Sequence, residues 1–396
     1  MASEKSRILF VDDEPRVMYG LRYMLHTMNK KWDMEFVTGS KAALEVMEKR
    51  PYDLIVADML MPEMYGGDLL EEIRKKHAGV VRFILSGYSN KEMIIRSFGA
   101  THQYLAKPCN AEILKGMVAQ VLYLQEQLPD ESLRTAVLDM KALPTLAERE
   151  DALLKALDTD GIAIEEVAEI IGSDVAMTAV VLHFVNSAFF GLRHKIENIE
   201  HAVTTLGIET IRDMFTKGEI LDRLAPEQAE AFGVANLYTH SCNVSARAGR
   251  IMQSLSENQA LTNEAVMAGM LHAIGILILV AVREGYAEIF EKYRSGQTSL
   301  AEAEAEMLGT SYAKVGGYLL GIWGLPEGIV DAVYHHLTPS ECANATLSPL
   351  TAVHVANILE MERLLGPDSP VLPPLDMDYL QKVGAQDMLE KWREDA

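Results

Sequence analysis

Five short apolar runs alternate with helical patterns in the first 125 residues, and this alternation constrains the fold more than any other feature. The runs read RILFV, EFV, DLIVAD, VRFILS and QYLAK. Runs that are apolar throughout are typical of strands buried on both faces, and strands that alternate with helices predict a parallel sheet. We therefore expect an α/β doubly wound, five-stranded parallel sheet of the flavodoxin-like kind. Its helices are predicted from residue 15 and over 40–49, 68–76, 90–98 and 111–127.

Polar side chains follow the ends of these strands. Asp12 and Asp13 come after the first strand, Asp58 after the third, Ser86 after the fourth and Lys107 after the fifth. In a doubly wound sheet, such residues gather at one edge. Three carboxylates there would repel one another without a cation, and their hard oxygen ligands suit Mg²⁺. A lysine and a hydroxyl opposite them suit a phosphoryl group, so the pattern predicts phosphoryl transfer onto a carboxylate.

Four phrases over residues 5–127 resemble the receiver domain of bacterial response regulators: VDDEP, VADMLMPEMYGGDLL, ILSGY and YLAKP. The resemblance implies that a sensor histidine kinase phosphorylates Asp58. It also implies that Lys107 and Ser86 bind the phosphoryl oxygens and that Tyr104 is an aromatic switch. The implied Mg²⁺ ligands are Asp12, Asp13, Asp58 and the backbone carbonyl of Leu60.

Beyond this region the patterns are almost all helical. Residues 128–143 are expected to form a short, stiff helical linker, because no Gly/Ser-rich stretch separates the halves and a helical pattern stops at Pro144. Residues 144–365 predict an all-α domain, since apolar residues recur at three-four spacing and no alternating strand is visible. Residues 366–396 are expected to form a tail that ends in an amphipathic helix, and the sequence leaves open whether this helix packs on the body or contacts a partner.

Three longer phrases in the second half resemble the HDOD domain, a helical output module related to the HD phosphohydrolases. They are AEIIGSDVAMTAVVLHFVNSAFFG, IENIEHAVTTLGIETIRDM and LGTSYAKVGGYLLGIWGLPEGIVDAVYHHLTP. The resemblance places His240, His272, His335 and His336 where active relatives hold their metals. Ala273, Tyr312 and Asn357 stand where further ligands would be expected. The implied HD site is therefore vestigial, with no metal expected in this domain.

Several functions of the second half stay open at this point. The first is a non-catalytic output that signals by protein–protein contact at the end of a two-component phosphorelay. The second is a metal-dependent cyclic dinucleotide phosphodiesterase, against which Ala273 and the missing GYP phrase argue. The third is a nucleotide sensor without turnover. Four histidines could also hold a single Zn²⁺.

The charge distribution bears on the partners. Residues up to Gln125 carry 17 Lys+Arg against 16 Asp+Glu, and subtracting these from totals of 36 and 57 leaves 19 against 41 for the rest. So acidic a surface repels nucleic-acid phosphates, and no nucleic acid is expected among the partners. We expect a sensor histidine kinase and an unknown downstream signalling protein, and the sequence leaves a homodimer open.

Three features predict a cytoplasmic protein without membrane insertion. The start, MASEKSRILF, lacks the apolar region of a signal peptide. The longest nearly uncharged apolar run, residues 269–282, is short for a membrane span and predicts a buried helix. Three widely spaced cysteines, Cys109, Cys242 and Cys342, form neither a disulfide framework nor a zinc motif.

Overall fold

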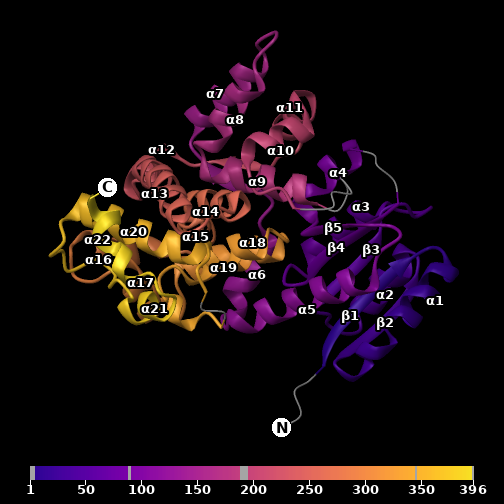
Figure 1. Cartoon of the computed structure of the whole chain (residues 1–396). Coiled ribbons are helices and arrows are strands. Elements are labelled where there is room, and N and C mark those ends of the chain that lie inside the picture. The colour runs from indigo at the N-terminus through magenta and orange to yellow at the C-terminus, as the bar shows by residue number, and fades with distance from the viewer. Residues whose placement is uncertain (1–4, 88–90, 188–194, 344–345, 395–396) are drawn as a thin grey trace.

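The computed structural model describes residues 5–87, 91–187, 195–343 and 346–394. Figure 1 shows an α/β half, drawn in indigo and purple, packed beside a larger helical half that runs from magenta to yellow. The α/β half holds a sheet of five parallel strands in the order β2-β1-β3-β4-β5. The strands are β1 (Ser6–Asp12), β2 (Trp32–Thr38), β3 (Leu54–Asp58), β4 (Val81–Ser86) and β5 (Gln103–Ala106). The predicted doubly wound sheet is confirmed.

The helices of this half follow the strands as the sequence predicts. They are α1 (Pro15–Met24), α2 (Ser40–Met47), α3 (Gly66–Lys76), α4 (Lys91–Ser97) and α5 (Ala111–Gln127), with short 3₁₀ turns η1 (His26–Lys30) and η2 (Phe98–Ala100). Helix α3 begins earlier than expected, and its first residue, Gly66, lies against the end of β3. A Cβ at Gly66 would stand 2.1 Å from the carbonyl oxygen of Asp58, so only glycine allows this approach.

The joint between the halves is only partly a helix. Helix α6 (Glu131–Asp139) is capped by Asp130, whose side chain accepts from the Leu133 amide at 3.1 Å. The chain then leaves the helix and forms β6 (Leu143–Thr145), which pairs in parallel with β7 (Leu221–Arg223). The prediction of an uninterrupted helical pattern up to residue 143, and of no strand beyond it, was therefore wrong. Strands of three residues are too short for alternation to reveal them.

The second half is otherwise helical. Helices α14 and α15 span Gln259–Val282, a stretch long and apolar enough to cross a membrane, with mean hydropathy 2.5. However, 83% of its most apolar window is buried inside the protein, as expected for a core helix. The helices are α7 (Ala147–Leu157), α8 (Ile164–Gly172), α9 (Val175–Asn186), α10 (Ile199–Leu206), α11 (Ile208–Lys217), α12 (Pro226–Ala231), α13 (Val234–Leu255), α14 (Gln259–Leu271), α15 (Ile274–Val282), α16 (Tyr286–Arg294), α17 (Leu300–Leu308), α18 (Tyr312–Ile322), α19 (Glu327–His335), α20 (Pro349–Leu365), α21 (Met377–Lys382) and α22 (Leu389–Glu394).

The tail packs on the body of the helical half. Leu389 and Trp392 of α22 are buried, and the Trp392 indole donates to the hydroxyl of Ser254 on α13 at 2.9 Å. The amphipathic pattern at the end of the chain therefore covers the protein's own core.

The two halves are held together at the joint by a buried arginine. Arg82 of β4 is fully buried, and its guanidinium donates to the carbonyl oxygens of Ala100 at 2.7 Å and Leu138 at 2.5 Å. The His102 ring accepts from the Arg82 amide at 3.0 Å and donates to the same Leu138 carbonyl at 3.1 Å. The end of α6 is thus anchored to β4 and β5 of the sheet.

Candidate functional site

The acidic residues predicted at the sheet edge lie together. Asp12 ends β1 and Asp58 ends β3, and both are buried because β1 and β3 are neighbours in the sheet. Lys107, just after β5, reaches across this edge. Its ammonium donates to Asp12 Oδ2 at 2.6 Å and also to Asp58 Oδ1. Two buried carboxylates therefore share one lysine.

Burial sets the electrostatics of this edge. Loss of solvent raises the pKa of Asp58, and the contact with Lys107 opposes that shift without cancelling it. Burial works to lower the pKa of Lys107, but the hydrogen bonds to Asp12 and Asp58 outweigh it and raise the pKa. Backbone amides add further donors, from Leu60 to Asp58 Oδ2 and from Glu14 to Asp12 Oδ1, both at 2.9 Å. The Lys107 ammonium and these backbone amides stabilise negative charge at the edge of the sheet.

The other predicted residues of the edge lie around this pair. Asp13 is half-buried beside Asp12, and Ser86 is half-buried at the end of β4, where its carbonyl accepts from the Lys107 amide at 2.8 Å. Tyr104 is buried, and its hydroxyl contacts the Ser97 hydroxyl at 2.9 Å and donates to the Ile94 carbonyl at 3.1 Å. The aromatic side chain predicted as a switch therefore already faces α4.

The donor chemistry of the edge fits Mg²⁺, since carboxylates and a backbone carbonyl are hard oxygen ligands. Within the described residues, however, no three His, Cys, Asp or Glu side chains are grouped so as to hold a metal. At the sheet edge, Lys107 contacts both Asp12 and Asp58.

A cluster of three histidines lies in the helical half. His240 of α13, His272 between α14 and α15, and His336 at the end of α19 pack with ring centroids 5.2 Å apart for both the 240–272 and 272–336 pairs. His272 donates through Nδ1 to the Gly269 carbonyl at 2.7 Å, and His336 donates through Nδ1 to the Val333 carbonyl at 2.8 Å. The structure therefore brings together three of the four predicted histidines.

Two further ring nitrogens of the cluster have protein partners. His336 Nε2 accepts from the Tyr312 hydroxyl at 3.2 Å, and His240 Nε2 contacts Asn357 Oδ1 at 3.0 Å. Burial lowers the pKa of His272 and takes that of His336 to about 3, so both rings are neutral near pH 7. Tyr312 and Asn357, which replace expected ligands, thus each contact a ring nitrogen that could otherwise bind a metal.

His335 lies apart from the three-histidine cluster. A further histidine, His354, contacts the backbone of that cluster. The His335 ring packs on Tyr334 with centroids 4.7 Å apart, and its Nδ1 has no partner among the described residues. His354 of α20, which the sequence analysis missed, donates through Nδ1 to the His336 carbonyl at 2.7 Å. It accepts at Nε2 from the Asp376 amide at 3.0 Å. His354 stands three residues before Asn357, and residues at this spacing lie on the same face of a helix. This spacing could have indicated from the sequence that His354 lies near the cluster.

A doubly wound sheet with a lysine-bridged pair of acids at its edge, followed by a mostly helical domain, defines a receiver-type module with an output domain. The family comparisons agree with this. The response regulator receiver domain matches residues 8–119, and the HDOD domain matches residues 143–339. The chain therefore belongs to the response regulators that join a receiver domain to an HDOD domain.

Two solved structures resemble about two thirds of this chain in fold. The MmoQ response regulator of Methylococcus capsulatus strain Bath is 23% identical, with a TM-score of 0.50 over 64% of this chain and 98% of that one. A virulence factor of Campylobacter jejuni is 22% identical, with a TM-score of 0.51 over 68% of this chain and all of that one. At these identities the likeness concerns the fold alone.

A curated relative matches the receiver half. The hydrogenase transcriptional regulatory protein HoxA of Cupriavidus necator is 29% identical over 127 residues. The match covers 32% of this chain and 26% of HoxA. The chain thus spans about a quarter of that relative.

Proposed function

We propose that the chain receives a phosphoryl group on Asp58 from a sensor histidine kinase and passes the signal on through a non-catalytic HDOD domain. The observation that carries the first part is the buried Asp58 beside Asp12, with Lys107 bridging both. An exposed acid on a loop would need neither burial nor a shared lysine.

Each residue at this edge of the sheet has its own role in the proposed phosphoryl transfer. A carboxylate oxygen of Asp58 attacks the phosphorus of the phosphohistidine, the new P–O bond forms as the P–N bond breaks, and the electron pair leaves with the donor imidazole. Bound by Asp12, Asp13, Asp58 and the Leu60 carbonyl, Mg²⁺ would supply the positive charge that lets an anionic donor approach. The ammonium of Lys107 and the hydroxyl of Ser86 stabilise the transferred phosphoryl oxygens.

Labelling with acetyl phosphate tests this proposal. We expect mass spectrometry to find one phosphoryl group on Asp58, lost in Asp58→Asn and abolished by EDTA. Lys107→Met should slow labelling strongly, whereas Asp68→Asn, an exposed acid on α3, serves as the matched control and should label normally. Label that persists in Asp58→Asn would rule out the assignment.

The proposal of a non-catalytic output rests on the contacts of the histidine cluster. Ala273 offers no carboxylate to bridge two metals, and Tyr312 and Asn357 engage His336 and His240. Without a bridging ligand, no shared hydroxide can form for attack on a phosphoester. The HDOD domain would then act through surfaces that contact an unidentified downstream protein in the cytoplasm.

Phosphodiesterase assays test the absence of catalysis. Cyclic dinucleotides and a generic phosphodiester should stay intact with Mn²⁺, Fe²⁺ or Zn²⁺ supplied, and the purified protein should carry no stoichiometric transition metal. Turnover that disappears in His272→Ala would establish the enzymatic alternative instead.

A further inference from the structure

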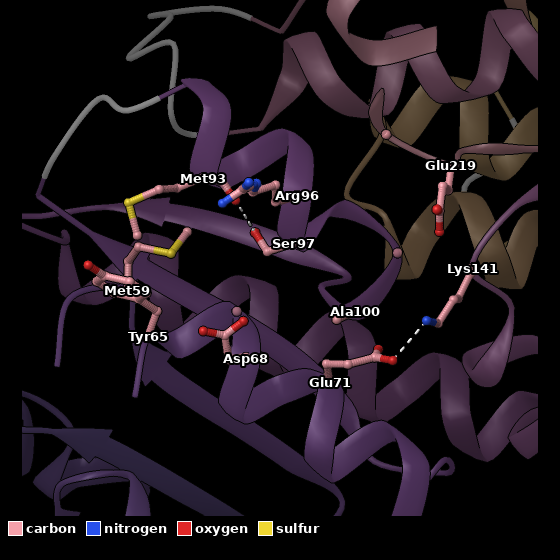
Figure 2. A pocket seen from close by; sticks show the side chains of 13 residues that line it. Met59, Tyr65, Asp68, Glu71, Met93, Arg96, Ser97, Ala100, Lys141 and Glu219 are labelled. Carbon is pink, nitrogen blue, oxygen red and sulfur yellow. Dashed lines mark hydrogen bonds and ion pairs between the residues drawn. The ribbon is translucent and has the colours of Figure 1, made fainter. Parts of the chain in front are cut away.

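A cavity of about 270 Å³ lies where the receiver meets the HDOD domain, and Figure 2 shows side chains that line it. Its receiver walls come from the end of β3, from α3, α4 and η2, and Gly218 and Glu219 before β7 close the HDOD side. Its described lining residues do not include Asp12, Asp58 or Lys107, so it is separate from the edge that carries them. Pockets for drug-sized ligands measure roughly 300–1,000 Å³, so this cavity suits a smaller metabolite.

Close packing of small residues shapes the walls of this cavity. A Cβ at Gly67 would stand 2.5 Å from Ser97 Cβ, so α3 and α4 meet here at a distance that only glycine allows. A Cβ at Gly99 would stand 3.2 Å from Lys141 Cβ, so η2 lies directly against the joint between the domains. The cavity is therefore bounded by elements that are packed against one another.

One wall of the cavity carries charges that neutralise one another. Glu71 accepts a hydrogen bond from Arg74 at 2.9 Å and another from Lys141 at 2.8 Å. Arg74 also pairs with Asp139. The hydrogen bond from Arg74 is the main cause that lowers the pKa of Glu71 to about 2, so this carboxylate stays ionised near neutral pH. Two cations and two anions satisfy each other here and leave no net charge for a ligand.

Three other charged side chains of the lining are uncommitted. They are Asp68 of α3, Arg96 of α4 and Glu219 before β7. All three are exposed, and within the described part of the chain none of them has a hydrogen-bond or ion-pair partner. Figure 2 shows that they reach the cavity from three different elements. The cavity thus offers a ligand one guanidinium and two carboxylates.

The backbone of Glu219 is strained. Its φ is 48°, in the left-handed region, and among the described residues it is the only residue other than glycine with a positive φ. Such a backbone is unfavourable for a residue with a side chain and persists when its surroundings impose it. Glycine would adopt the same conformation without strain, but it would bring no carboxylate to the cavity. The strain at this position therefore favours a role for the Glu219 side chain.

Apolar side chains complete the lining. Met59, directly after β3, and Met93 of α4 both face the cavity (Figure 2). The thioether side chain of methionine is flexible and adapts its shape to an apolar group that packs on it. A ligand for this cavity therefore combines charged groups with an apolar stem.

We propose that this cavity binds a basic amino acid, such as lysine or ornithine, which carries two ammonium groups and one carboxylate on an unbranched apolar stem. Arg96 pairs with the ligand carboxylate, and Asp68 and Glu219 pair with its two ammonium groups. The stem packs on Met59 and Met93. The charges of the ligand then match the uncommitted charges of the cavity in sign and number, and the proposal does not depend on phosphoryl transfer.

Calorimetric titration of the full chain with L-lysine tests the ligand class. We expect saturable binding at one site. L-norleucine, which lacks the side-chain ammonium, and cadaverine, which lacks the carboxylate, should each bind at least about tenfold more weakly, because each loses a charge-assisted hydrogen bond. Norleucine that binds as tightly as lysine would overturn the proposal, as would the absence of saturable lysine binding.

A further compound separates a free amino acid from a lysine of a partner protein. Nα-acetyl-lysine amide presents only the side-chain ammonium, as a lysine within a protein does. We expect it to bind at least about tenfold more weakly than L-lysine. Equal affinity for both compounds would show that the site takes a protein lysine and would overturn the assignment to a small molecule.

Substitutions locate the binding site. Arg96→Gln and Glu219→Gln should each weaken lysine binding at least about tenfold, with urea midpoints showing that both variants are folded. Glu45→Gln, at an exposed position of α2 outside the cavity, is the matched control and should bind as the wild type does. Asp68→Asn should bind lysine more weakly and still accept a phosphoryl group on Asp58, which keeps the two proposals distinguishable. Unchanged lysine affinity in the Arg96 and Glu219 variants would place the binding elsewhere and overturn this site.

Discussion

Mild acid should destabilise this protein through histidines that the fold buries in neutral form. His102, His183, His272, His336 and His354 are each at most 4% exposed. Burial lowers the pKa of all five, to about 3 for His183 and His336. Below pH ~6.5 the unfolded chain protonates these rings, while the folded chain keeps them neutral. Stability is therefore fully present above that pH and is lost as the pH falls towards the folded pKa values.

The size of the effect follows from the number of rings. Each histidine that stays neutral in the folded state loses ~1.4 kcal/mol of stability per pH unit below ~6.5, so His183 and His336 together lose ~3 kcal/mol between pH ~7.5 and ~5.5. The lowered pKa values of His102, His272 and His354 add to this loss. Buried Glu304 acts in the opposite direction. Burial raises its pKa to about 7, so it takes up a proton more readily in the folded state as the pH falls. It returns ~2 kcal/mol over the same interval. The less buried carboxyls of Glu264 and Asp331, whose pKa values are raised to about 7 and about 6, act in the same direction, so the net loss is smaller than the sum over the histidines.

Urea unfolding followed by tryptophan fluorescence at both pH values measures this loss. His336→Gln should be less stable than the wild type near neutral pH, but its stability should fall by ~1.4 kcal/mol less between pH ~7.5 and ~5.5. His26→Gln, at an exposed position of the receiver, is the control and should follow the wild type. An equal fall in all three proteins would show that buried neutral histidines do not set the acid sensitivity.

Two further substitutions test the receiver. Arg82→Met should lower stability by ~3 kcal/mol or more, because it removes the side-chain donors to the buried carbonyls of Ala100 and Val80; a urea midpoint unchanged from the wild type would contradict the anchoring role. Gly66→Ala should cost ~1–3 kcal/mol and slow acetyl phosphate labelling, because its Cβ would press on the Asp58 carbonyl; normal labelling would show that the turn after β3 yields without moving Asp58.

The receiver half could be predicted from sequence because its signals are local. Strands buried on both faces read as continuous apolar runs, and the functional side chains follow directly after them. Lys107, Asp12 and Asp58 could therefore be placed at one edge of the sheet, but β4 separates β5 from β3, so the contact itself depends on the long lysine side chain reaching across that edge. Arg82 is the exception within this half. It stands in the middle of β4 and is fully buried, because its hydrogen-bond acceptors include Leu138, far away along the chain.

The histidine cluster could be predicted only in part. The resemblance pointed to His335 and His336 together, but neighbouring residues on a helix point about 100° apart, so both cannot face one centre. The structure places His336 in the cluster and His335 beside Tyr334. The short strands β6 and β7 lie on either side of five helices, and no local pattern could have paired them.

The apolar pattern of helix α9 is the sequence feature that bears on how the two domains pack. Helix α9, VAMTAVVLHFVN, is buried at every position from Val175 to Val185. A helix that is apolar all round must be covered on every side, whereas a helix at a domain surface keeps a polar face. Its single histidine, His183, contacts the receiver at His102 and Phe98. Helices α8, α10 and α14 and strand β6 of the same domain cover most of α9, and the receiver covers the part around His183, so a change at Phe98 reaches α9 directly.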